Sequence, residues 1–302
     1  MIKSINLEIT NICNLKCSIC DIWKNKNWSF LDEKNINNIL SSKYINKDLD
    51  ITITWWEPFL NTDINNIVKS INTLWFKVNT ISTNWTFYNK LEKLLSFCNT
   101  NNFILPNIHI SIDWLEDKHE LQRWVKWSFR QSINTIIKLK KRFKDINIKI
   151  KYTITKNNIS DIKKVYILSK RLLVDISFKI VENDEFYTNR ISKTNLIDND
   201  KKNDIVNILK SIYKNNDYIN NLIFYIQNDK LNFKCTTPSD NLFIMADWET
   251  YCCTKYKSIW NIKKEKIDNI INNLSHMDII STVDNINCSK CFSLHWSYNI
   301  LK

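Results

Sequence analysis

The sequence of 302 residues contains no glycine. At about 7% glycine, an average chain of this length would carry roughly 21. Glycine takes positive φ at tight turns and helix ends, and it lets the backbone approach a ligand closely. Two explanations are open. Asparagine, which tolerates the left-handed region, fills these turns, or many of the 12 tryptophans stand for glycine, as when a code that reads UGA as glycine is translated with UGA as tryptophan.

Long apolar runs and an apolar N-terminal segment are also missing. No run approaches the roughly 18 residues that a membrane helix requires, and residues 1–8 contain no signal-like stretch. We therefore expect a cytoplasmic protein with no membrane partner. A hydrophobic fraction of 44% in 302 residues predicts one large core, or a large domain with a small appendage. It excludes the disordered and collagen-like classes.

The charge is unbalanced, with 43 Lys and Arg against 31 Asp and Glu, a formal net charge of +12. Such a balance often indicates a nucleic-acid partner. Here the lysines are scattered, and the densest group, residues 138–142, falls on the exposed face of a predicted amphipathic helix. A solvated surface therefore explains the charge, and we do not expect nucleic acid as a partner.

Strands alternate with helices through the first two-thirds of the chain. Six such units predict an α/β fold with a parallel sheet, either open and doubly wound or a partial barrel, and periodicity alone does not choose. Segments rich in Ile, Val, Thr or Phe predict strands at 6–10, 51–54, 77–83, 107–113, 149–155 and 175–181. Helical patterns fall near 32–42, 63–74, 87–98, 131–144 and 159–172.

A second, smaller module is expected in the last third. A polar stretch at 182–202 and a helix at 203–215 precede it, and short strands are expected from Asp217 onward. We therefore divide the chain into residues 1–215 and residues 216–302. The second part carries cysteines at positions 235, 252, 253, 288 and 291.

Three cysteines, Cys13, Cys17 and Cys20, follow the first predicted strand with the spacing Cys-x3-Cys-x2-Cys. In a cytoplasmic chain this clustering favours a metal centre over a disulfide. Three thiolates are one short of the four that saturate structural zinc or an iron-sulfur cluster, which leaves an open position for chemistry. A zinc site that takes its fourth ligand from elsewhere is the alternative. Cys98, alone on an apolar helix face, is expected in the core.

The segment around these cysteines, residues 11–23, resembles the signature of the radical S-adenosylmethionine (radical SAM) enzymes. Four further segments extend the resemblance. Residues 54–58, Thr-Trp-Trp-Glu-Pro, stand where the family has Gly-Gly-Glu-Pro; residues 82–85 and 111–114 stand where it has Ser-x-Asn-Gly and Ser-Ile-Asp-Gly; and residues 123–129 resemble Arg-Gly-Val-Lys-Gly-Ser-Phe. In each of the four, tryptophan occupies a glycine position.

This resemblance implies a partial (β/α)6 barrel of the TIM type, with the site at the C-terminal ends of the strands. It implies a site-differentiated [4Fe-4S] cluster on Cys13, Cys17 and Cys20, whose fourth iron chelates S-adenosylmethionine. Reductive cleavage would then give a 5′-deoxyadenosyl radical that abstracts hydrogen from a substrate. Arg123 is a candidate for pairing with the cofactor carboxylate. The residues implied at the cofactor are Trp55, Trp56, Glu57, Ser82, Asn84, Ser111, Asp113 and Arg123.

The tryptophan positions coincide with family glycines, which favours recoding. Trp23 is interpreted as genuine, and Trp28 and Trp296 are undecided. If Trp55 and Trp56 are literal, their indoles fill the space of the cofactor's methionine end, and the fold has lost cofactor binding. The nine positions interpreted as glycine are 55, 56, 75, 85, 114, 124, 127, 248 and 260.

The C-terminal cysteines resemble the twitch module, a shorter relative of the SPASM domain. Cys235 and Cys253 flank Trp248 as Cys-x12-Trp-x4-Cys, and Cys288-x2-Cys291 follows. Four thiolates would saturate one auxiliary [4Fe-4S] cluster, and a structural zinc knuckle is the alternative. Spacing favours Cys253 over Cys252 as the ligand.

The resemblance implies a radical SAM oxidoreductase of the maturase type, in which net oxidation or cross-linking of a substrate follows hydrogen abstraction. A peptide or protein is favoured as substrate over a sugar-derived small molecule, and a flavodoxin or ferredoxin is expected as electron donor. The rival interpretation is a non-catalytic, cysteine-stapled zinc protein that binds nucleic acid with strong salt dependence.

Overall fold

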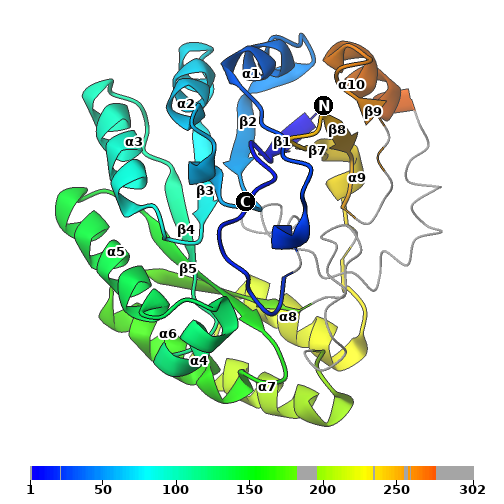
Figure 1. Ribbon diagram of the computed structural model, residues 1–302. Helices are drawn as coiled ribbons and strands as arrows, with labels where there is room; N and C mark the ends of the chain where they lie inside the picture. Colours follow the sequence, from blue (N-terminus) through cyan, green and yellow to red (C-terminus); the bar gives the residue numbers. More distant parts are fainter. Residues whose placement is uncertain are drawn as a thin grey trace.

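A computed structural model describes residues 2–20, 22–181, 196–233, 235–254, 258 and 260–276 (Figure 1). In this part of the chain the strands form one sheet in the order β6-β5-β4-β3-β2-β1-β7-β8-β9. Every neighbouring pair from β6 to β7 is parallel, and β8 and β9 continue antiparallel. The strands are β1 Ile2–Leu7, β2 Ile45–Ile53, β3 Val78–Thr83, β4 Asn107–Ser111, β5 Ile148–Ile154, β6 Asp175–Ile180, β7 Asn241–Ile244, β8 Glu249–Tyr251 and β9 Trp260–Asn261.

Helices connect the parallel strands and follow one another around the outside of the curved sheet (Figure 1). The α/β class and the six predicted strand-helix units are confirmed, and the arrangement is a partial barrel with a smaller α+β region after it. The helices are α1 Glu33–Leu40, α2 Ile64–Thr73, α3 Tyr88–Thr100, α4 Glu116–Arg123, α5 Ser128–Arg142, α6 Ile162–Arg171, α7 Asn199–Ile212, α8 Asp217–Asn228, α9 Thr237–Asp240 and α10 Ile267–His276.

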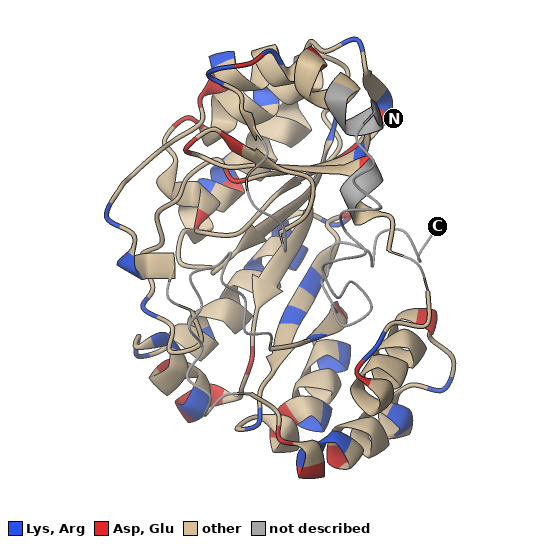
Figure 2. Cartoon of the chain, turned by 90° about the vertical axis from the view of Figure 1, so that its right-hand side faces the viewer, with Lys and Arg blue, Asp and Glu red and all other residues tan. Residues whose placement is uncertain are grey.

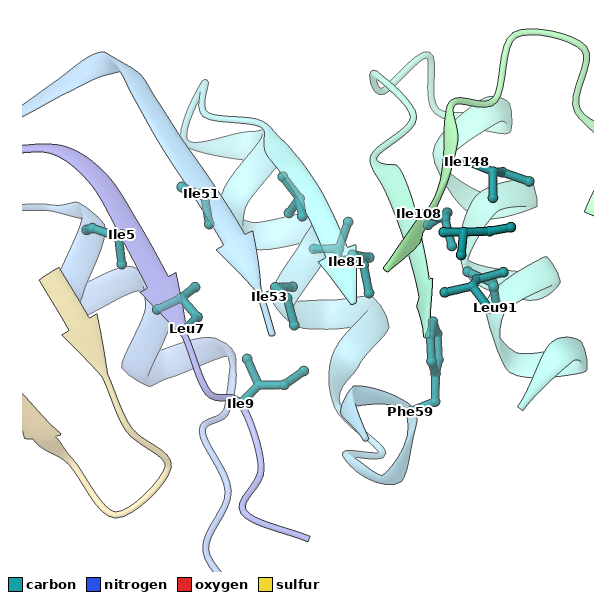
Figure 3. Close-up of a cluster of buried hydrophobic side chains, with 14 of the residues drawn as sticks. Ile5, Leu7, Ile9, Ile51, Ile53, Phe59, Ile81, Leu91, Ile108 and Ile148 are labelled. Atoms are coloured by element: carbon teal, nitrogen blue, oxygen red, sulfur yellow. The ribbon is translucent and has the colours of Figure 1, made fainter. Parts of the chain in front are cut away.

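The core lies between the sheet and these helices. One row of side chains, Leu7, Ile53, Ile81, Ile108 and Ile148, crosses five strands in register. All five are fully or almost fully buried, and Figure 3 shows them with their neighbours. Burying one such side chain stabilises the fold by about 1.5–3 kcal/mol. The alternation of these residues with polar ones leaves the opposite face of the sheet polar.

Two helices differ from the expectation. Residues 217–228 were expected as short strands, but they form α8, because the Asn216 side chain accepts from Ile219 N at 2.9 Å and the apolar positions 219, 222, 223 and 226 share one helix face. Helix α4 was not predicted, since its sequence EDKHELQR is almost entirely polar and offers no apolar period. The boundary drawn at residues 215 and 216 falls between α7 and α8 and remains a prediction.

Tryptophan dominates the left-handed backbone positions. Nine described residues have positive φ, and the six tryptophans among them are Trp55, Trp75, Trp85, Trp124, Trp127 and Trp248. All six belong to the nine positions interpreted as glycine; Trp56, Trp114 and Trp260 do not take positive φ. A bulky side chain in this region costs about 1–2 kcal/mol, whereas glycine adopts it freely.

The local hydrogen bonds are those of glycine motifs. At the end of α2, Trp75 N donates to Asn72 O and Phe76 N to Ile71 O, both at 3.0 Å. This pair of bonds defines a Schellman motif, whose left-handed residue is usually glycine. In the β7–β8 hairpin, Trp248 N donates to Met245 O at 2.9 Å with Trp248 left-handed, the pattern of a turn that ends in a glycine bulge.

Trp75→Gly should therefore stabilise the protein. The Trp75 side chain is 84% exposed, so little burial is lost, and relief of the left-handed conformation should raise the free energy of unfolding by about 1 kcal/mol. Chemical denaturation measures the change. The matched control is Trp28→Gly, at a 69% exposed tryptophan without positive φ, where no gain is expected. Equal gains in both variants would contradict the interpretation.

Candidate active site

The polar face of the sheet is the inner face of the partial barrel, opposite the helices. Thr52, Thr80 and Asn107 lie side by side on it through the register of β2, β3 and β4. The residues implied at the cofactor gather where these parallel strands end, because the C-terminal ends of parallel strands meet at one edge. Ser82 and Ser111 are partly buried on this inner face, near the ends of β3 and β4.

Three tethers hold the cysteine loop, residues 13–20, over this edge. Ser18 N donates to Gln122 O at 2.9 Å, next to the end of α4. Glu57 N donates to Ile12 O at 3.1 Å, just before the loop. The amide of Asn84, at the end of β3, donates to Asn14 Oδ1 at 2.9 Å and lies 3.7 Å from Cys13 Sγ. The loop is therefore fixed to the ends of β2 and β3 and to α4.

The three thiols are partly buried and interact with one another. Burial raises the pKa of Cys13 to about 11 and that of Cys20 to about 12, and proximity to the other thiols adds to both shifts. Burial also raises the pKa of Cys17, against the opposing effect of Arg123. The pocket thus disfavours three free thiolates, and a cationic centre that displaces the protons would be needed to hold them.

The side chains around these thiols suit an iron-sulfur cluster, which takes each thiolate on a different iron. Among the residues that the structure describes, no three Cys, His, Asp or Glu side chains are placed to hold one metal ion. The donor set is all sulfur, with a guanidinium and an amide beside it, which suits an anionic thiolate cluster.

Glu57 connects the ends of β2 and β3 from below the loop. Its buried carboxylate accepts from Asn84 N at 2.7 Å, from Thr83 Oγ1 at 2.9 Å and from Phe59 N at 3.2 Å. Burial raises its pKa to about 7 although these donors oppose the shift. All its strong bonds go to the protein, so the carboxylate positions the backbone of the two strand ends.

Asp113 and Arg123 form a buried pair beside the cysteines. Arg123 Nη2 lies 2.9 Å from Asp113 Oδ2 and 3.3 Å from Ser111 O. Asp113 Oδ1 also accepts from Thr153 N at 2.7 Å, which ties β4 to β5. Arg123 therefore balances Asp113 and faces Cys17, and its expected pairing with a cofactor carboxylate remains a prediction.

His119 lies one helical turn before Arg123 and is fully buried. Burial and the charge of Arg123 lower its pKa well below the usual value, so the ring is neutral at physiological pH. Neither ring nitrogen has a hydrogen-bond partner among the described residues.

Two indoles occupy the inner face at the end of β2. The Trp55 ring lies 5.4 Å from the Phe243 ring, and Trp56 Nε1 donates to Glu8 Oε2. Glu8 is a buried carboxyl that the sequence analysis missed; burial raises its pKa to about 8. An acidic residue between Leu7 and Ile9, both apolar, was the available signal for a side chain on the opposite face.

The C-terminal cysteines are described in part. Cys252 is fully buried, whereas Cys253 and Cys235 are partly buried at the margin of the core. Burial raises the pKa of Cys252 to about 11. Cys288 and Cys291 lie outside the described residues. Cys98 is buried on α3, as expected.

The sequence model that defines the Radical SAM superfamily matches residues 7–168, which is more than half of the chain. The sporulation killing factor maturation protein SkfB of Bacillus subtilis is 28% identical over 163 residues, which cover 54% of this chain and 38% of that protein. GTP 3′,8-cyclase of Vibrio parahaemolyticus is 28% identical over 119 residues, 38% of this chain and 34% of that protein. The chain therefore matches little more than a third of each curated relative.

Solved structures with the same fold cover most of the chain. Streptococcus suis SuiB bound to precursor peptide SuiA gives a TM-score of 0.68 at 16% identity, over 90% of this chain and 64% of that chain. Native anSMEcpe with bound AdoMet gives a TM-score of 0.69 at 17% identity, over 91% of this chain and 82% of that chain. No helix in the described part of the chain is long and apolar enough to span a membrane.

Proposed function

Because the chain belongs to the radical SAM superfamily, we propose that it is a peptide-modifying enzyme with its cluster on Cys13, Cys17 and Cys20. When bound, the [4Fe-4S] cluster and S-adenosylmethionine supply one-electron cleavage to a 5′-deoxyadenosyl radical. The observation that carries the proposal is the tethering of an all-thiol loop over the strand ends by Asn84 and by the backbone of Glu57.

The chain's own residues hold and shield this site. Asn84 donates toward Cys13 Sγ, and Arg123 places a positive charge at Cys17, which together favour the anionic thiolate forms. Asp113 keeps the guanidinium in place through the 2.9 Å contact. The backbone at positions 55 and 56, set by Glu57, would lie against the cofactor, and Ser82 and Ser111 would line its other side.

A peptide substrate is the proposal best supported by the relatives. SuiB is bound to a precursor peptide, and SkfB is named for the maturation of a killing factor. Reductive cleavage of S-adenosylmethionine would require a one-electron donor, for which a flavodoxin or ferredoxin is proposed. Net oxidation or cross-linking of the peptide would release an electron, and an auxiliary cluster would accept it. Cys235 and Cys253, with Cys288 and Cys291, are proposed as ligands of an auxiliary [4Fe-4S] cluster, and the half-buried state of Cys253 favours it over Cys252.

The test is iron per chain after anaerobic reconstitution, with release of 5′-deoxyadenosine assayed in the same sample. The protein is made with glycine at tryptophan positions 55, 56, 75, 85, 114, 124, 127, 248 and 260. About eight irons per chain with release of 5′-deoxyadenosine would support both clusters. About four irons per chain with release would support the enzyme with one cluster and contradict the auxiliary cluster. Zinc without iron, and no release, would contradict the enzyme and favour the zinc-stapled binding protein.

A further inference from the structure

A cavity of about 480 Å³ opens on the inner face of the sheet, in a part of the chain that the chemistry above does not use. It lies against β3, β4, β5 and β6, beside the turn between α7 and α8. Its strand side is polar and basic, and its helix side presents aromatic rings. The lining includes Lys149, Lys151, Lys170, His109, Tyr213 and Tyr218.

Two lysines project from one strand into this cavity. Lys149 and Lys151 are two residues apart on β5, so both lie on the inner face, and both are partly buried. Neither ammonium makes a hydrogen bond or ion pair with the described residues. Asp175 pairs with Lys149 in the strand register but is exposed and forms no ion pair with it in the described part. Figure 2 shows blue bands on strands in the centre of the view, with red mainly in helices and loops around them.

Among the described residues, the lining of the cavity is therefore net positive, with Lys149, Lys151 and Lys170 against the one carboxylate of Asp175. Burial, together with Lys149 and Lys179, lowers the pKa of Lys151 to about 7. Burial and the two β5 lysines lower the pKa of His109 well below its usual value, so its ring adds no charge. Partly buried ammonium groups without a counter-ion are unfavourable, and an anion placed between them would be stabilised.

The cavity also lies at a useful depth below the proposed reaction site. Lys151 is two residues before Thr153, whose N–H binds Asp113 Oδ1. At about 3.3 Å per strand residue, Lys151 lies about 7 Å and Lys149 about 13 Å along β5 from the residue that binds Asp113. A substrate anchored by the lysines would extend from them toward the cysteine loop.

We propose that this cavity binds a carboxylate of the substrate peptide, so that the substrates are acidic peptides. The ammonium groups of Lys149 and Lys151 pair with the carboxylate, and Tyr213 and Tyr218 pack against the carbon atoms of the same residue. This inference rests on the proposed function, because it concerns the substrate of the same barrel. The carboxylate belongs either to an acidic side chain or to the peptide's C-terminus.

The test uses the full chain without cluster or cofactor and three labelled alanine octapeptides, measured by fluorescence anisotropy at low salt. One carries a central glutamate and an amidated end, one a central glutamine and an amidated end, and one a central glutamine and a free C-terminal carboxylate. At least one carboxylate peptide should bind about tenfold more tightly than the amidated glutamine peptide. Whichever does so identifies the source of the carboxylate.

Variants separate the cavity from the rest of the surface. The tenfold preference should disappear in K149M/K151M and persist in K151R, which keeps the charge, and in K163M, at an exposed lysine on α6. Circular dichroism checks that K149M/K151M folds. Equal affinity for all three peptides, no binding of any, or an unchanged preference in a folded K149M/K151M would overturn the proposal. GTP serves as an anion of another kind, since it carries phosphates in place of a carboxylate. Tighter binding of GTP than of every peptide would also overturn the proposal. None of these outcomes touches release of 5′-deoxyadenosine, which tests the proposed function separately.

Discussion

Cys17→Ala should lower the release of 5′-deoxyadenosine to the level of a protein-free control. Cys17 is the middle cysteine of the loop and the one that faces Arg123, so its loss leaves one iron without a protein ligand, while Arg123 keeps its ion pair with Asp113. Iron content should fall by about four per chain, while iron at the C-terminal cysteines stays. The measurement is product release with S-adenosylmethionine and a chemical reductant, alongside iron analysis.

Cys98→Ala is the matched control. It makes the same change at a cysteine that is buried on α3, in the core rather than in the loop. This variant should lose some stability through the cavity it creates, but it should keep its iron and its product release. Continued release of 5′-deoxyadenosine from Cys17→Ala, or equal losses of iron and product release in the two variants, would contradict the assignment of the cluster to the cysteine loop.

The second large effect is expected at the end of β2. The double change W55G/W56G should increase affinity for S-adenosylmethionine by about 10- to 100-fold, because two partly buried indole rings no longer have to leave the inner face. Exposing one fully buried side chain costs about 1.5–3 kcal/mol, so two half-buried rings together cost about the same, and each 1.4 kcal/mol is about tenfold in affinity. Equilibrium dialysis of the iron-reconstituted chain with labelled cofactor measures the change.

Trp75→Gly serves as the control, because it makes the same substitution at an exposed helix end. It should leave cofactor affinity unchanged. The gene itself provides a second check: UGA codons at positions 55 and 56, and a native peptide with the mass of the glycine form, are expected. UGG codons, together with no gain of affinity in W55G/W56G, would mean that the tryptophans are literal and that the fold has lost cofactor binding.

Much of the scaffold was predictable from local sequence. Runs such as those at 77–83 and 149–155 are rich in β-branched residues, and they appear as β3 and β5 within a residue or two of the predicted limits. The grouping of the site followed from the same pattern, because segments after successive parallel strands must meet at one edge. Helix α4 was not predicted, because its polar sequence has no apolar residues at helical spacing.

The direction of individual side chains was not predictable in the same way. The place of Glu57 in the cofactor site stays a prediction, and what the sequence did not indicate is that its carboxylate accepts from Thr83 and Asn84, which are distant in sequence. The pairing of Arg123 with Asp113 and the exposure of Lys149 and Lys151 to one cavity likewise depend on contacts between strands. Such contacts are set by tertiary packing between distant segments, and a local sequence pattern does not predict them.

The left-handed residue at the end of β2 has a consequence for the inheritance of this protein. If Trp55 marks a UGA codon, ribosomes that treat UGA as a stop would release the chain there, after the cysteine loop but before Glu57. The fragment would have the thiols without the carboxylate that fixes the strand ends beneath them. A copy of the gene transferred to an organism with the standard code would therefore yield no full-length protein. The enzyme would stay confined to lineages that share its code.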